Sequence, residues 1–491
     1  MVAPTSCDVL IVGAGPVGAT LALLLAQQGV TVVATDKAAD IYPLPRAAHI
    51  DHEIVRVFQQ LGVADDVMAA SKIAGRYDFL NPSGQVLLRF EQDRGSPSGW
   101  PASNMIHQPS VEACLRRRLQ GMAGLSLHTE WALIRYQTGA DGVAATFQTP
   151  TGEQTVRAKY LVGCDGARST VRDLAQIALE DLDFDEPWLV IDTLVLDASR
   201  LPDINLQICD PARPTTCVQM GAGRHRWEFM LLPGETTEQV MDDAFIADLL
   251  EPWKVEGAVR LERKAVYRFH ALIARQWRKD RVFLAGDAAH QTPPFAGQGL
   301  CAGVRDAANL AWKLAQVLKG QAQEALLDTY QAERAPHVRF VIDLALMMGR
   351  TVCILDPKAA AARDEAMLAQ RAAGGGPGGA FSFPPFEAGC LLASSPGAGE
   401  LFPQPWTTTA NGTARMDDLL TGPGPWLIER SWTARMDGFS LTEERLAPFA
   451  DSLEAWFTHR QADAVLVRPD HYVFGTGKPA DLLAAWRAAV T

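Results

Sequence analysis

The chain has 491 residues, of which 48% are hydrophobic, and its 45 Lys and Arg against 57 Asp and Glu give a net charge of −12. A chain of this length can bury large cores in about three domains, and its composition excludes wholesale disorder. The acidic balance also excludes binding of nucleic acid over a broad surface, although a local basic cleft remains compatible with it.

The eight cysteines include no C-x-x-C pair. This spacing argues against a zinc ribbon, an iron–sulfur cluster or a dithiol redox site, so no metal is expected, and it is typical of reduced thiols. The N-terminal residues show no secretory signal, and glycines and a proline interrupt the apolar stretch 9–26. We therefore expect a cytoplasmic protein with neither a membrane nor a nucleic-acid partner.

Taken in chain order, the patterns predict an α/β protein in several parts. Apolar strands that alternate with helices predict a parallel sheet in a discontinuous domain made of 1–74, 100–180 and 271–356. Strand-like runs with Pro- and Gly-containing loops predict an inserted antiparallel sheet domain made of 75–99 and 181–270.

The last part of the chain changes composition. Residues 357–414 contain a glycine-rich run and many prolines, which predicts a linker or an irregular connection. Residues 415–491 regain strand-like and helix-like patterns and predict a small C-terminal α/β domain.

The first motif follows an apolar strand at 7–12. Gly13, Gly15 and Gly18 form a G-x-G-x-x-G pattern, a helical segment follows, and a second strand ends at Asp36. In this setting the glycines allow a tight turn, approach of a pyrophosphate and close helix packing, while the acid accepts ribose hydroxyls. A glycine turn without a ligand is the alternative, and the motif does not distinguish FAD from NAD.

A second motif lies far downstream. An apolar strand ends at Asp287, a loop containing Gly297 and Gly299 follows, and helical spacing predicts a helix over about 300–318. The carboxylate can accept a hydrogen bond from a sugar-alcohol hydroxyl, and the glycines leave room for a flat ring against the backbone. The start of the helix would direct amides toward that ring.

Together with the segment 164–169, these two motifs resemble the class A flavoprotein aromatic hydroxylases, which have the p-hydroxybenzoate hydroxylase fold. The resemblance spans about 7–345. It implies a Rossmann-like FAD-binding domain with an inserted antiparallel-sheet substrate domain. Five further segments resemble the 3-(3-hydroxyphenyl)propionate hydroxylase subfamily more closely: 188–192, 209–214, 226–230, 233–235 and 326–331.

The C-terminal segment has a resemblance of its own. Residues 468–473 resemble the end of the thioredoxin-like C-terminal domain of related hydroxylases. Because the chain has no C-x-x-C pair, we expect this domain to be redox-inert.

The resemblance also implies a set of FAD-binding residues. They are Gly13, Gly15, Pro16, Val17, Gly18, Asp36, Lys37, Arg46, Gln108, Asp165, Gly286, Asp287, Pro294, Gly297, Gly299, Leu300 and Cys301. It implies Asp287 on the ribityl chain, Arg46 near the flavin and pyrophosphate, and Asp165 linked to both FAD and NAD(P)H. The backbone amides of Leu300 and Cys301 are expected at the pyrimidine edge.

The expected reaction follows from the family. No second dinucleotide fingerprint is present, so NADH or NADPH is expected to dock transiently and reduce FAD. The resemblance implies that dioxygen then forms a flavin C(4a)-hydroperoxide, which hydroxylates an aromatic ring. We expect a phenol similar to 3-(3-hydroxyphenyl)propionate to be hydroxylated ortho to its hydroxyl group.

The sequence offers few candidates for catalytic or substrate-binding residues. The catalytic residues are not identified by the sequence, and the candidates are Arg46, Pro294 and Phe295, of which Phe295 is expected to face the reacting side of the flavin. Arg213 and Arg226 are candidates for binding a substrate carboxylate, and Phe295 for contacting the ring. For each arginine the alternative is a solvated surface charge, and for Phe295 a packing aromatic in a loop.

Two other functions stay open at this level. The first is the same chemistry on an aromatic polyketide or another secondary metabolite. The second, of a different class, is a catalytically silent FAD-binding protein. A flavin-dependent halogenase is disfavoured, because the chain has no W-x-W-x-I-P segment. The expected partners are a small aromatic substrate, dioxygen and a second copy of the chain in a homodimer.

Overall fold

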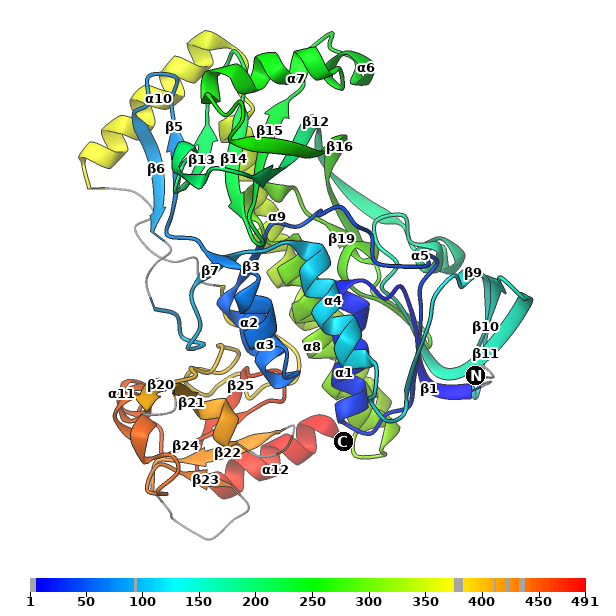
Figure 1. The fold of residues 1–491 in the computed structure, drawn as a ribbon. Coiled ribbons are helices and arrows are strands. Elements are labelled where there is room, and N and C mark those ends of the chain that lie inside the picture. Colours follow the sequence, from blue (N-terminus) through cyan, green and yellow to red (C-terminus); the bar gives the residue numbers. More distant parts are fainter. Residues whose placement is uncertain are drawn as a thin grey trace.

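The computed structural model describes residues 6–91, 95–374, 383–409, 412–420, 422, 424–431 and 438–491. Figure 1 shows three parts: a sheet at the top, an α/β domain below it, and a C-terminal part at lower left. This is the α/β class that the sequence predicts, with a Rossmann-like domain and an inserted sheet. No helix in the described residues is both long and apolar enough to cross a membrane.

The first sheet has eight strands and belongs to the α/β domain. Its main path is β17 (Arg278–Lys279), β18 (Val282–Leu284), β11 (Gly152–Gly163), β1 (Ser6–Val12), β2 (Val32–Thr35) and β8 (Leu125–His128); β10 (Gly142–Thr149) and β9 (Ala132–Gly139) extend from β11. β8, β2, β1, β11 and β18 pair in parallel. Strands of this kind are covered on both faces, which explains the continuous apolar run of β1.

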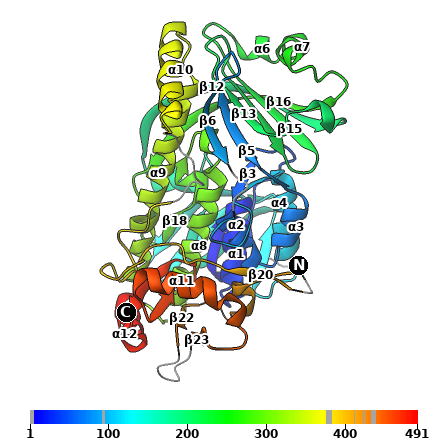
Figure 2. The ribbon, with the colours of Figure 1, turned by 90° about the vertical axis from the view of Figure 1, so that its left-hand side faces the viewer.

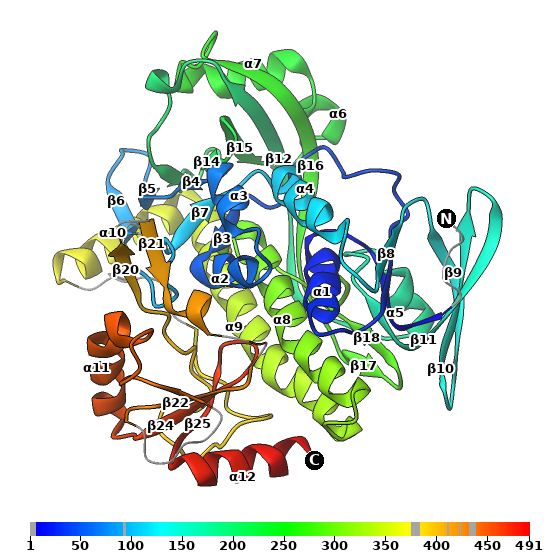
Figure 3. The same cartoon turned by 60° about the horizontal axis from the view of Figure 1, so that its bottom comes forward.

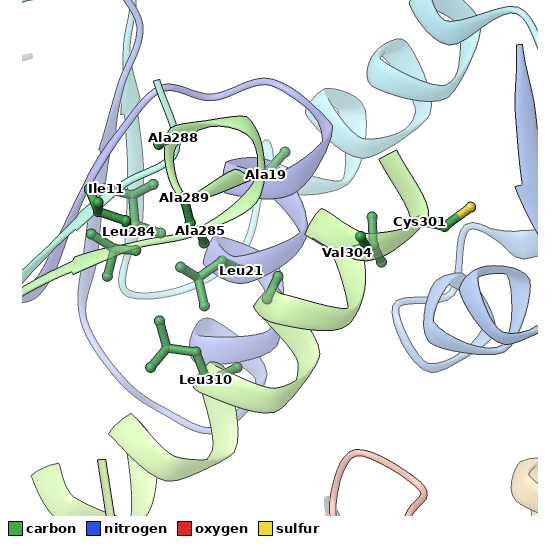
Figure 4. Packing of buried hydrophobic residues seen from close by; sticks show 14 of the residues in the cluster. Ile11, Ala19, Leu21, Leu284, Ala285, Ala288, Ala289, Cys301, Val304 and Leu310 are labelled. Carbon is green, nitrogen blue, oxygen red and sulfur yellow. The ribbon is translucent and has the colours of Figure 1, made fainter. Parts of the chain in front are cut away.

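Helices cover this sheet. They include α1 (Pro16–Gln27), α4 (Gln108–Leu119), α5 (Thr170–Ala175), α8 (Gly299–Leu318) and α9 (Thr329–Val352). In Figure 4 buried side chains of α1 and α8, such as Leu21 and Leu310, lie together beside the strand residues Ile11 and Leu284. This packing joins the start of the chain to residues near 300, so both sequence motifs reach one end of the sheet.

The second sheet also has eight strands, mostly antiparallel. Its order is β19 (His290–Gln291), β16 (Val259–Ala274), β12 (Leu179–Val195), β15 (Arg224–Met230), β14 (Thr215–Met220), β13 (Asn205–Ile208), β5 (Arg76–Leu80) and β6 (Val86–Glu91). β13 and β5 pair in parallel, so strands from the early chain join strands that follow more than a hundred residues later.

The two faces of this second sheet differ. Along β15, Trp227 and Phe229 belong to a core that is closed by α7 (Asp243–Leu250) and the short α6 (Thr237–Val240). Arg226 and Glu228 alternate with them and face the other way, because successive strand residues point to opposite sides. The second face therefore carries polar groups and turns toward the α/β domain.

A third sheet of three short strands lies between these parts. It is formed by β3 (His49–Asp51), β7 (Ser103–Met105) and β4 (Lys72–Ile73). The helices α2 (His52–Gln60) and α3 (Ala64–Ala69) follow β3 along the chain. Asp51 begins α2, since its side chain accepts hydrogen bonds from the first amides of that helix.

One prediction from the sequence is wrong for part of its range. Residues 357–414 were expected to be a linker or an irregular connection, but α10 (Pro357–Ala372) is a regular helix, which Figure 2 shows beside the second sheet. Asp356 caps it by accepting a hydrogen bond from Ala359 at 2.7 Å, and Pro357 occupies its first turn. The segment 357–372 is rich in alanine, which has the highest helix propensity. The glycine-rich residues after Gly374 lie outside the described residues.

The C-terminal part has a four-stranded sheet. Its order is β23 (Phe439–Ser440), β22 (Trp426–Glu429), β24 (Ala464–Val467) and β25 (Val473–Gly477), with α11 (Ala450–Arg460), α12 (Pro479–Val490) and a hairpin of β20 (Trp406–Thr409) and β21 (Gly412–Arg415). β22 and β23 are parallel and the other pairs antiparallel, which is a thioredoxin-like arrangement. Figure 3 shows α12 near the end of α8, where Trp486 packs on Trp312 with ring centroids 5.6 Å apart.

Candidate functional site

One large cavity of about 1460 Å³ lies between the α/β domain and the polar face of the second sheet. Nearly all of the site residues expected from the sequence line it. The exceptions are Gly18, Gly286, Cys301 and Arg213. Chain segments nearly 300 residues apart therefore meet around a single space.

The glycines of the first motif have three different surroundings. A Cβ on Gly13, whose φ is +98°, would lie 2.4 Å from the carbonyl oxygen of Cys164. A Cβ on Gly18 would lie 1.9 Å from the carbonyl oxygen of Gly13. A Cβ on Gly15 would meet nothing within 4 Å, and Gly15 borders the cavity where α1 begins. Gly13 and Gly18 thus allow the turn itself, whereas Gly15 leaves open space beside unpaired helix amides, as a pyrophosphate requires.

Asp36 follows β2, and its Oδ1 atom accepts a hydrogen bond from the amide of Ala38 at 2.9 Å. Its Oδ2 atom accepts hydrogen bonds from the amide of Ala14 and from Nη2 of Arg116, both at 3.2 Å. Arg116 also lines the cavity, and its buried Nε has no partner within the described residues. The sequence did not single out Arg116, because a run of three arginines in α4 resembles a solvated helix face. Its unpaired donor adds it to the candidates for anion binding.

A loop near Arg46 is fixed from two sides. Oε1 of Gln108 accepts hydrogen bonds from the backbone amides of Arg46 at 3.2 Å and Ala47 at 2.8 Å. From the second sheet, Arg226 donates to the carbonyl oxygens of Pro45 at 2.8 Å and Arg46 at 2.9 Å. The side chain of Arg46 lines the cavity and is exposed to it. The loop therefore presents the guanidinium of Arg46, which lies 5.0 Å from the centroid of the Tyr42 ring, to the space that it borders.

Two carboxylates of the expected set have different roles. Asp165 accepts hydrogen bonds from the Ser169 hydroxyl and, at 3.1 Å, from the Val171 amide, so it organises its own loop and the start of α5. Burial raises the pKa of Asp165. The side chain of Asp287 has no hydrogen bond among the described residues, and it is open to the cavity. Desolvation raises the pKa of Asp287, and the charges of His290 and Arg46 oppose this. An unpaired carboxylate facing the cavity fits the hydroxyl groups of a ribityl chain.

The loop before α8 brings backbone amides to the cavity. Gly297 has φ +63°, and a Cβ there would lie 3.3 Å from the His49 side chain. The first helical hydrogen bond joins the amide of Ala302 to Gln298, so the amides of Leu300 and Cys301 precede it and have no helical partner. The Cys301 side chain is fully buried and points toward β3, and burial raises the pKa of its thiol well above the usual value.

An aromatic wall forms one side of the cavity. The ring of Phe295 lies edge-on to three others, with centroid distances of 5.9 Å to Phe184, 5.7 Å to Trp188 and 6.1 Å to Phe269. Such edge-to-face contacts hold aromatic rings in a fixed orientation. Phe295 and Phe269 also line the cavity, which therefore has a rigid flat-sided region.

Polar side chains of the second sheet line another part of the cavity. The hydroxyl of Tyr77 donates to Oε1 of Gln207 at 3.1 Å, and that of Thr216 donates to the same oxygen at 2.8 Å. Glu228 lies opposite Thr216 in the neighbouring strand. All four side chains line the cavity. The sequence did not single out any of them, because strand alternation does not reveal which face borders a cavity.

The two arginines expected to bind a substrate carboxylate are both paired within the protein. Arg213 forms two hydrogen bonds of 2.6 Å with Glu235 and does not line the cavity. Arg226 lines the cavity, but its guanidinium is used by Asp192, at 2.6 Å, and by the loop carbonyls near Arg46. A paired guanidinium stabilises the fold and is not available for a ligand. The structure therefore gives no support to the expected substrate role of Arg213 or Arg226.

Comparisons with known proteins show the family to which the chain belongs. The FAD binding domain family model matches residues 6–345, and the HcaD C-terminal domain model matches residues 442–491. A probable NADH-specific resorcinol 4-hydroxylase of Rhodococcus jostii is 37% identical over 97% of this chain and 93% of its own length. A 3-(3-hydroxy-phenyl)propionate/3-hydroxycinnamic acid hydroxylase of Mycolicibacterium smegmatis is 40% identical over 74% of this chain and 65% of its own.

Solved structures support the same fold. The flavin-dependent monooxygenase PieE, in complex with FAD and substrate, aligns with a TM-score of 0.82 at 23% identity, covering 99% of this chain and 100% of that one. Aklavinone-11 hydroxylase, in complex with FAD and aklavinone, aligns with a TM-score of 0.78 at 24% identity, covering 100% of this chain and 99% of that one.

The fold and the cavity define a flavoprotein monooxygenase with a Rossmann-like FAD-binding domain. The chain belongs to the family of FAD-dependent aromatic hydroxylases of class A.

Proposed function

We propose that this chain consumes NAD(P)H and dioxygen to add a hydroxyl group to a phenolic ring, ortho to the hydroxyl already present. One observation carries this proposal: loops with dinucleotide-binding chemistry and a sheet face with aromatic and polar groups border the same cavity. Its volume of about 1460 Å³ is larger than the ~300–1,000 Å³ of an ordinary small-ligand pocket. A flavin and a flat phenol can therefore lie side by side, as transfer of oxygen between them requires.

The residues present fit FAD. In this proposal the start of α1 beside Gly15 receives the pyrophosphate, Asp287 accepts hydrogen bonds from the ribityl hydroxyls, and the amides of Leu300 and Cys301 face the pyrimidine edge. Arg46 adds a positive charge near the pyrophosphate. Bound FAD would supply electron transfer from NAD(P)H and activation of dioxygen, which is the chemistry that the family resemblance implies.

The protein's own contribution is orientation and exclusion of water. Phe295 is fixed by the rings around it, and Pro294 precedes it in the same turn, so this segment forms a rigid surface against which a substrate ring can lie. A fixed approach of the two rings selects which carbon is hydroxylated. This assigns Pro294 and Phe295 a positioning role, while Arg46 serves the cofactor.

The names of the relatives suggest the substrates to assay. One relative is called a resorcinol hydroxylase and is called NADH-specific; others are called hydroxylases of 3-(3-hydroxyphenyl)propionate. Both compounds are phenols with a substituent meta to a hydroxyl group. We therefore propose NADH as the preferred reductant and a meta-substituted phenol as the substrate.

The test is an absorbance spectrum of the purified protein followed by NADH and NADPH consumption with each phenol. We expect a yellow protein, consumption stimulated by a phenol, and a product with two hydroxyl groups on adjacent carbons. An FAD-containing protein that no simple phenol stimulates would contradict the phenol proposal. Stimulation by compounds of several fused rings would then favour the secondary-metabolite alternative. No consumption with any aromatic compound would favour a catalytically silent FAD-binding protein.

A further inference from the structure

The side chain of Glu228 lies in the wall of the cavity, on the polar face of the second sheet. It pairs with Thr216 of β14 and with Val190 of β12, and it alternates with the buried core residues Trp227 and Phe229. Glu228 is only 8% exposed, yet it lines the cavity. Its carboxylate is thus withdrawn from bulk water and faces the space available to a ligand.

Two neighbours locate Glu228 relative to the flavin loops. On one side Arg226, two residues earlier on the same face, reaches the loop carbonyl of Arg46. On the other side Trp188, which pairs with Met230, has its ring 5.7 Å from Phe295. Residues two apart in a strand are separated by about 7 Å, so Glu228 lies between the two segments that we expect to border the flavin.

The carboxylate has unused capacity to accept hydrogen bonds. Its one ion pair in the described part of the chain is a 3.5 Å contact from Oε1 to Nη1 of Arg226, which already donates to the Arg46 carbonyl at 2.9 Å. The nearby hydroxyls of Tyr77 and Thr216 both donate to Gln207. Neither of these two hydroxyls is therefore directed at Glu228, and a ligand hydroxyl would fill that place.

The groups around Glu228 act on the pKa of its carboxylate in opposite directions. Burial raises the pKa of Glu228, and the charge of Arg226 opposes this. Asp192 on β12 raises it further, while Arg263 on β16 lowers it. A carboxylate with a raised pKa takes a proton more readily than one in water.

Given the proposed phenol hydroxylation, we infer that Glu228 binds the substrate hydroxyl and accepts its proton, and that the site prefers neutral benzenediols over phenols bearing a carboxylate. In this step the phenolic O–H bond breaks, its electron pair stays on the oxygen, and the proton moves to a carboxylate oxygen of Glu228. The added electron density activates the ring carbon ortho to that oxygen. The proton returns to the product oxygen before release, so the residue is regenerated.

The preference for a neutral substrate follows from the same charges. A substrate carboxylate close to Glu228 would meet a like charge in a poorly solvated space, which is unfavourable. Arg226 cannot compensate for this without giving up Asp192 and the loop carbonyls. A benzenediol brings no second negative charge. Its second hydroxyl can form a hydrogen bond with the polar side chains of Tyr77, Gln207 or Thr216.

The test compares the wild-type holoenzyme with Glu228→Gln, Glu228→Asp and the control Glu262→Gln. Glu262 lies on β16 of the same sheet, pairs with Arg224 and does not line the cavity. For each protein we would measure FAD content, resorcinol binding by its effect on the flavin spectrum, and product formed per NADH across a pH series. The same measurements with 3-(3-hydroxyphenyl)propionate give the substrate preference.

We expect Glu228→Gln to keep FAD but to form hydroxylated resorcinol at least 10-fold more slowly, with loss of the limb of the pH profile that rises with pH. Its preference should shift toward the carboxylate-bearing phenol. Glu228→Asp should retain the pH-dependent limb, and Glu262→Gln should match the wild type. If Glu228→Gln keeps the wild-type turnover and pH profile, the role of Glu228 is overturned, but the proposed function still stands. A wild type that hydroxylates no phenol would overturn the proposed function, and the role of Glu228 with it.

Discussion

Gly15 and Gly18 are three residues apart, but substitution to alanine should affect them differently. In Gly18→Ala the new Cβ would collide with the Gly13 carbonyl, so we expect a loss of about 1–3 kcal/mol in the free energy of unfolding. In Gly15→Ala the Cβ has free space and φ is −68°, so the fold should be unchanged while FAD binding weakens. Denaturant unfolding of the apoproteins and FAD titration separate the two effects. Equal stability losses would contradict this distinction.

The carboxylate of Asp287 is expected to act on the cofactor rather than on the fold. It has no hydrogen bond in the described residues, so Asp287→Asn should leave the stability of the apoprotein nearly unchanged. Hydrogen bonds to a charged group are worth about 1.5–3 kcal/mol, so FAD affinity should fall roughly 10- to 100-fold. Flavin fluorescence titration measures this, with the exposed Asp243→Asn as a control. Unchanged affinity would remove Asp287 from the set of FAD-binding residues.

At the scale of elements, strand β15 is tied to the loop at residues 45–46 by a buried cation. Arg226→Met should leave Asp192 and the Pro45 carbonyl bound by Arg263 alone and free the Arg46 carbonyl. Breaking a buried pair costs about 3–5 kcal/mol, so we expect lower stability and weaker FAD binding together. Arg224 forms a partly exposed ion pair with Glu262, so Arg224→Met should lower the free energy of unfolding by about 1 kcal/mol or less. Thermal unfolding and FAD titration test both, and a change in substrate binding alone would instead favour the carboxylate-binding role.

The elements also show what the sequence could and could not predict. Local patterns were sufficient for the strand, turn and helix around Gly13, because the backbone there requires glycine at Gly13 and Gly18. Arg116 and Glu228 could not be recognised, since their importance depends on which helix or sheet face borders the cavity. The inserted sheet was predicted, but the sequence did not show which of its two faces borders the cavity. The helix α10 was missed because nearby glycines and prolines outweighed its alanine-rich stretch.

At the scale of the whole molecule, a fully buried ion cluster joins the C-terminal part to α8 and α9. Glu333 of α9 lies 2.6 Å from Arg468 and 2.8 Å from Lys313, and Arg468 also pairs with Asp470. Buried charges of this kind are costly to separate. The docking of the C-terminal part therefore depends on the ionisation of Glu333.

This dependence predicts a sensitivity to acid. The neighbouring cations lower the pKa of Glu333 from its usual 4.5 to about 2. A lowered pKa means that the stabilisation is complete above pH 4.5 and is lost as pH falls from about 4.5 toward 2. Glu333→Gln should lose this part of the pH dependence and destabilise the protein by about 3–5 kcal/mol at pH 7. Unfolding curves at several pH values check this, and a parallel pH dependence in both proteins would contradict it.

The cavity has a consequence for the order of events during synthesis. Its walls combine the glycine loop after β1 with Asp287 and the start of α8. Roughly 270 residues separate the two loops, which at ~5–20 residues per second corresponds to about 14 to 55 seconds of translation. A nascent chain thus exposes a finished glycine turn long before it has a complete cofactor site. Flavin can be captured in full only when α8 has left the ribosome, so loading is a late step in the making of this enzyme.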